Sequence, residues 1–107
     1  MRSWRTAATT RKLEAAFREL LAGRPSAQAF TTERLSALST VVSKDTWRQV
    51  AAYGPLQSFA FVEDDTSASA KTRALRYKAA LGPRLVLLRF ALDEDGKVAE
   101  INVEEEE

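Results

Sequence analysis

The sequence predicts an α+β domain in which three helices pack on one face of a curved, four-stranded antiparallel sheet. Up to Pro55 the apolar residues recur at spacings of three and four, the period of a helix with one buried face. Beyond Pro55 apolar and polar residues alternate, which is the period of a strand. Helices followed by strands are typical of α+β domains. We therefore expect residues 1–107 to form a single domain, with a flexible N-terminus at 1–8 and an acidic tail at 104–107.

An amphipathic helix is expected over residues 10–22, with Thr9 or Thr10 as its N-cap. Gly23 can end this helix in a left-handed conformation, and Pro25 prevents its continuation. The apolar stripe that would face the sheet consists of Leu13, Ala16, Phe17, Leu20 and Leu21.

Two short helices are expected next. One lies within residues 30–42 and is capped by Thr31 or Thr32, and the other is capped by Asp45 and ends at Gly54. The residues expected to face inward are Leu35, Leu38 and Val42 in the first of them, and Trp47, Val50 and Ala51 in the second.

The second half predicts four strands, over residues 56–63, 70–81, 84–93 and 97–103. The last two are joined by the turn "DEDG", with Gly96 at the position that needs a positive φ. In the last strand we expect Ala99, Ile101 and Val103 to share one face.

Four segments carry a resemblance to a known family: "YGPL", "SFAFVE", "RALRYKAAL" and "LVLLRFALDEDGKVAEINV". Together they resemble the nuclear transport factor 2-like, or cystatin-like, α+β cone superfamily. Within it they resemble the small domains attached to bacterial serine hydrolases related to β-lactamases. The matching positions are Gly54 with Leu56, Tyr77, and Phe90 through Val98. The resemblance implies a cone-shaped fold that often dimerises through its sheet. It also implies a buried carboxylate base in catalytic relatives, for which this chain offers no mid-strand candidate.

The strand over residues 84–93 is apolar on both faces. Alternation sends Val86, Leu88, Phe90 and Leu92 toward the helices, which leaves Leu85, Leu87 and Ala91 on the outer face of the sheet. Exposed leucines forgo about 1.5–3 kcal/mol each and form a patch. Either arginine stems shield this strip, or it packs on a second copy or another domain. The expected interface is Arg76, Lys78, Leu85, Leu87 and Arg89.

A second hypothesis concerns the aromatic residues. They either pack as core between helices and sheet, or line a pocket inside the cone in which tyrosine hydroxyls meet a small apolar ligand. The pocket would be lined by Trp47, Tyr53, Phe61, Tyr77 and Phe90. A minor enzyme of the isomerase or dehydratase kind would use the same pocket.

Composition excludes several classes of site. The chain has no Cys and no His, which excludes disulfides, thiolate zinc sites and Ser-His-Asp triads. The acidic turn at 93–96 is too short for an EF-hand loop, so we expect neither a metal nor a cofactor. The net charge is +1, and alternation splits the basic residues between two faces, so we expect no nucleic-acid partner.

The sequence also lacks a signal peptide and any apolar run of the ~18–20 residues that a membrane span needs. We therefore expect no membrane contact, and a cytoplasmic location unless the domain belongs to a longer, exported protein. The function that the residues favour is a non-catalytic binding or assembly module, acting as a homodimer or beside a hydrolase domain. The alternative is a small-molecule binder.

Overall fold

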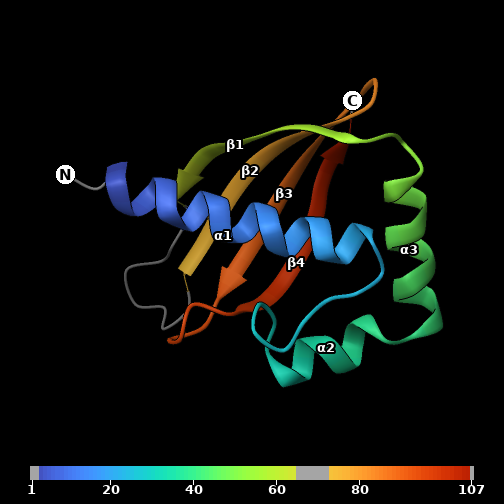
Figure 1. Cartoon of the computed structure of the whole chain (residues 1–107), viewed down its shortest axis with the longest axis horizontal. Helices are drawn as coiled ribbons and strands as arrows, with labels where there is room; N and C mark the ends of the chain where they lie inside the picture. The colour runs from blue at the N-terminus through green and yellow to red at the C-terminus, as the bar shows by residue number, and fades with distance from the viewer. Residues whose placement is uncertain (1–2, 65–72, 107) are drawn as a thin grey trace.

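In a computed structural model of the chain, three helices cover one face of an open antiparallel sheet (Figure 1). The structure describes residues 3–64 and 73–106. The strands lie side by side in the order β1-β2-β3-β4, a simple meander. The elements are α1 (Ser3–Leu21), α2 (Thr32–Leu38), α3 (Val41–Ala51), β1 (Leu56–Asp64), β2 (Arg73–Leu81), β3 (Arg84–Leu92) and β4 (Val98–Glu106). The predicted α+β class is confirmed.

Helix α1 begins seven residues earlier than the apolar stripe predicted. Residues 3–8, expected to be flexible, are helical, and this stretch contains no Gly or Pro that would stop the helix. Thr10 is therefore not a cap. The helix ends as predicted, with Gly23 at φ +78° and with the Arg24 N–H bonded to the Glu19 carbonyl, as in a Schellman motif.

Helix α2 is tied to the start of β4. The Thr31 hydroxyl caps the helix by accepting from the Arg34 N–H at 3.1 Å, as predicted. Just before the cap, Phe30 forms an isolated bridge with Val98, and the Thr31 N–H donates to the Val98 carbonyl at 3.0 Å. The Arg34 guanidinium donates to the Ala99 carbonyl at 2.8 Å. These bonds fix α2 against the start of β4 and pair backbone groups on its outer edge, which no other strand covers in the described sheet.

Helix α3 starts at Val41, with Thr40 as its N-cap, so two predictions about this region are wrong. Asp45 is not a cap; it lies inside α3 and accepts a hydrogen bond from the Gln49 side chain. Val42 does not face the core; it is 78% exposed, because the chain breaks between α2 and α3 instead of continuing one helical stripe.

Bulges in both edge strands curve the sheet. In β4, Leu92 pairs with Val98 while Ala91 pairs with Glu100, so Ala99 is an extra residue with no opposite residue in β3. Val98 is consequently buried in the place on the core face that was predicted for Ala99. Strand β1 has two similar register shifts, the second between Phe61 and Glu63.

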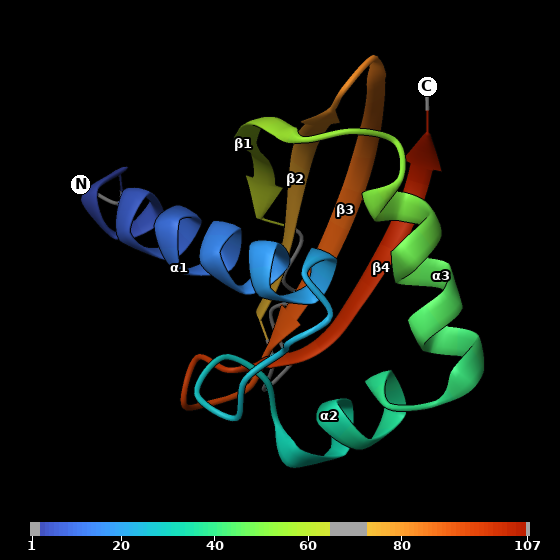
Figure 2. The same ribbon diagram turned by 45° about the vertical axis from the view of Figure 1, so that its right-hand side comes forward.

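The core fills the space between α1 and the sheet. Its centre is aromatic: the Phe59 ring stacks on Tyr77 with centroids 4.7 Å apart, and Phe90 meets Tyr77 edge-on at 5.7 Å. Phe17 of α1 joins this cluster through Phe59, at 5.9 Å. Figure 2 shows all three helices on the same side of the sheet, so no described helix covers the opposite face.

Candidate functional site

The outer face of the sheet brings together all five residues of the expected interface. In the β2–β3 register Arg76 pairs with Arg89, Lys78 with Leu87, and Ala80 with Leu85. We call Arg76, Lys78, Leu85, Leu87 and Arg89 the outer-face patch. Its two leucines belong to β3, an inner strand of the sheet, and Leu85 is 36% exposed while Leu87 is half-buried.

Arg76 is held by carboxylates on both edges of the sheet. Its guanidinium forms an ion pair with Glu63 of β1 and another with Glu104 of β4, where Nε and Oε1 are 2.8 Å apart. The side chain therefore crosses the neighbouring strand, and its aliphatic stem shields part of the apolar strip. Glu104, expected in a frayed acidic tail, lies instead in β4, which continues to Glu106. The attraction between Arg76 and Glu104 across the sheet favours this position of Glu104, and the pairing of β4 with β3 continues to Glu106.

The outer face carries both signs of charge. Its cations are Arg76, Lys78 and Arg89, and its anions include Glu63, Glu100 and Glu104, which the register and the Arg76–Glu104 ion pair place on the same side. A face that is apolar at its centre and carries both signs of charge around it can pack on a copy of itself.

The predicted aromatic pocket is not present as one cavity. Tyr77 and Phe90 are fully buried and Trp47 is 8% exposed, because Phe17 and Phe59 fill the interior of the cone around them.

The remaining two members of the predicted pocket lie apart. Phe61 is 39% exposed in the edge strand β1, where its ring meets that of Tyr77 edge-on with centroids 5.6 Å apart. Tyr53 is half-buried after α3, with the Arg84 guanidinium 4.8 Å from its ring centroid. The other expectation for these aromatic residues, that they pack as core, therefore describes three of the five: Trp47, Tyr77 and Phe90.

The Tyr77 hydroxyl lies 3.0 Å from the Thr10 hydroxyl, at the partly buried edge of the core. Burial raises the pKa of Tyr77 above its usual value of 10.0, although the Thr10 bond and the nearby charge of Arg73 both act to lower it. The phenol is therefore protonated at neutral pH. No charged side chain is buried among the residues whose exposure is described, so no carboxylate lies beside Tyr77 in the core.

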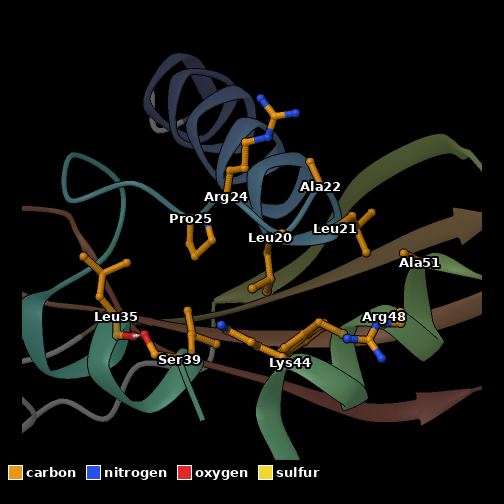
Figure 3. Close-up of a pocket in the computed structure, with 13 residues that line it drawn as sticks. Leu20, Leu21, Ala22, Arg24, Pro25, Leu35, Ser39, Lys44, Arg48 and Ala51 are labelled. Atoms are coloured by element: carbon orange, nitrogen blue, oxygen red, sulfur yellow. Dashed lines mark hydrogen bonds between the residues drawn. The ribbon is translucent and has the colours of Figure 1, made fainter. Parts of the chain in front are cut away.

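A groove of about 700 Å³ opens on the helical side, between the C-terminal end of α1, α2 and α3 (Figure 3). We call it the helix groove. It is lined by Leu20, Leu21, Ala22, Gly23, Arg24, Pro25, Leu35, Leu38, Ser39, Lys44, Trp47, Arg48 and Ala51. Only Trp47 belongs to the predicted pocket, because the groove depends on how three helices meet, which periodicity within each helix does not reveal. The one feature of the sequence that could have indicated the helix groove is a set of three cationic residues near helix ends: Arg24, Lys44 and Arg48.

Within the described part of the chain, no three acidic side chains gather in a way that would hold a metal ion, and no helix is long and apolar enough to span a membrane. Comparison of the chain with protein-family models, with curated proteins and with solved structures finds no match. The resemblance to nuclear transport factor 2-like domains therefore stays a prediction.

Proposed function

We propose that the chain is a non-catalytic assembly module, in which two copies pack the outer faces of their sheets together. One observation carries this proposal: Leu85 and Leu87 project from an inner strand toward a face that no described helix covers. An apolar strip at the centre of a sheet, rimmed by charged side chains, is typical of an interaction surface.

The charges on this face favour a second copy as the partner. In a two-fold interface the same patch lies on both sides, so cations of one copy can lie opposite carboxylates of the other. The resemblance to a superfamily that dimerises through its sheet agrees with this arrangement. The resemblance to hydrolase-attached domains suggests a second occupant for the same face, a linked hydrolase domain.

The size of the face predicts a weak dimer. Four strands ~4.8 Å apart and nine residues long at ~3.3 Å each cover about 19 Å by 30 Å. Two such faces bury roughly 1,100 Å² in total, near the lower limit for a specific interface. We therefore expect an equilibrium between monomer and dimer that shifts with protein concentration.

Leu87→Glu is expected to dissociate this dimer without unfolding the chain. A central interface residue contributes about 2 kcal/mol, and a two-fold dimer changes two of them, so the dissociation constant should rise roughly 1,000-fold. Sedimentation equilibrium over a concentration series measures this constant. The control is Val42→Glu, because Val42 is an exposed apolar residue on the helical side. Equal effects of the two variants, or a wild type that stays monomeric, would argue against the proposal.

The alternative function, a ligand pocket inside the cone, loses its predicted lining because the aromatic residues pack against one another as core.

A further inference from the structure

We propose that the helix groove binds a single-chain amphiphile with an anionic headgroup, of the chemical class of a medium-chain fatty acid anion. This site lies on the helical side of the molecule and does not depend on association through the sheet.

The apolar wall of the helix groove comes from all three helices. The lining residues are Leu20 and Leu21 at the end of α1, Leu35 and Leu38 in α2, and Trp47 in α3. The volume of about 700 Å³ lies within the ~300–1,000 Å³ of small-molecule sites. An alkyl chain placed there would lie against aliphatic side chains and one indole.

The charged part of the helix groove is entirely cationic. Arg24, Lys44 and Arg48 line it, and none of the lining residues is acidic. Figure 3 shows the Lys44 side chain extending into the gap below Leu20, whereas the Arg24 side chain projects outward from the end of α1. Arg48 already pairs with Asp45 at 3.5 Å. Among the described residues no carboxylate pairs with Lys44, so its ammonium is the group best placed to meet an anionic headgroup.

The shape of the groove favours a flexible amphiphile over a peptide helix. A docked helix uses anchors over about two turns and needs a straight path of roughly 11 Å. An alkyl chain needs no straight path and can follow the gap between three helices.

The test uses decanoate as the ligand and methyl decanoate as its neutral counterpart, with ¹H–¹⁵N correlation spectra of the full chain. Decanoate should shift the amides of residues 20–25, 35–39 and 44–51, and bind at least about tenfold more tightly than the ester, because a charge-assisted contact is lost in the ester. In a Trp4→Phe background, the fluorescence of Trp47 gives the same affinities independently.

Lys44→Met keeps the aliphatic stem and should reduce decanoate affinity to that of the ester, while Lys44→Glu should abolish decanoate binding. The matched control is Lys12→Glu, an exposed α1 lysine outside the groove lining, which should bind as the wild type does. If Leu87→Glu binds decanoate with the affinity of the wild type, the groove binds its ligand independently of dimer formation.

Three results would overturn the proposal: no binding of decanoate, equal affinities for decanoate and its ester, or equal losses from Lys44→Glu and Lys12→Glu. Amide shifts confined to the sheet would also overturn it. Binding of an acidic peptide in place of decanoate would assign the groove to a protein partner.

Discussion

Gly54→Ala is expected to lower the free energy of unfolding by at least about 3 kcal/mol, or to prevent folding. Gly54 has a φ of +141°, a conformation that L side chains rarely adopt. A Cβ at this position would lie 2.6 Å from the Cα of Gly82. The neighbouring atom belongs to the backbone and not to a mobile side chain. The clash can therefore be relieved only if the loop after α3 or the β2–β3 turn moves.

This contact matters for the outer-face patch, because it joins the loop after α3 to the turn that precedes Leu85. The Gly82 N–H also donates to the Pro55 carbonyl at 3.0 Å. Urea unfolding followed by far-ultraviolet circular dichroism measures the loss. Gly23→Ala is the matched control: its φ of +78° is also strained, but nothing lies within 4 Å of the added Cβ, so a loss of only about 1 kcal/mol is expected. Equal losses would contradict the close approach of the two glycines.

Phe17→Ala is expected to lower the free energy of unfolding by about 3–5 kcal/mol, the usual cost of removing a buried aromatic ring. Phe17 is fully buried and contacts rings in two other elements. Its ring centroid lies 6.3 Å from that of Trp47 in α3 and 5.9 Å from that of Phe59 in β1. The substitution therefore opens a cavity at the point where α1, α3 and the sheet meet.

The next residue provides the control. Arg18 is exposed and pairs with Glu14 at 3.0 Å, an interaction worth at most about 0.5 kcal/mol on a helix surface. Arg18→Ala should therefore leave the unfolding midpoint almost unchanged in the same urea titration. A small loss for Phe17→Ala, close to that of Arg18→Ala, would mean that α1 is not anchored in the core as described.

The change of period at Pro55 was sufficient to predict the helices, the strands and their order, because each apolar stripe follows from spacing within one element. The predictions were wrong where the local structure depends on residues that are distant in the sequence. Ala99 was placed on the core face because alternation assumes an uninterrupted strand, and the bulge that replaces it with Val98 depends on pairing with β3. The Thr40 cap was missed because the region reads equally well as one helix continuing past it.

The two candidate sites differ in how far sequence can predict them. The outer-face patch depends on alternation along two strands, so Leu85 and Leu87 were placed on the correct side from their parity alone. Glu104 was missed, since a run of four glutamates is typical of a tail and its partner Arg76 is 28 positions away in sequence. The helix groove was missed as well. Its walls come from three helices, and the apolar pattern within each helix does not specify how the helices cross.

The most direct test of the proposed function locates the contact between copies in the wild type. We suggest an isotope-filtered nuclear Overhauser experiment on a mixture of ¹³C-labelled and unlabelled chains, at a concentration where sedimentation shows dimer. Intermolecular contacts should arise from the methyl groups of Leu85 and Leu87. Contacts confined to Val41 and Val42, the exposed apolar residues at the start of α3, would contradict the assignment of the sheet face as the interface.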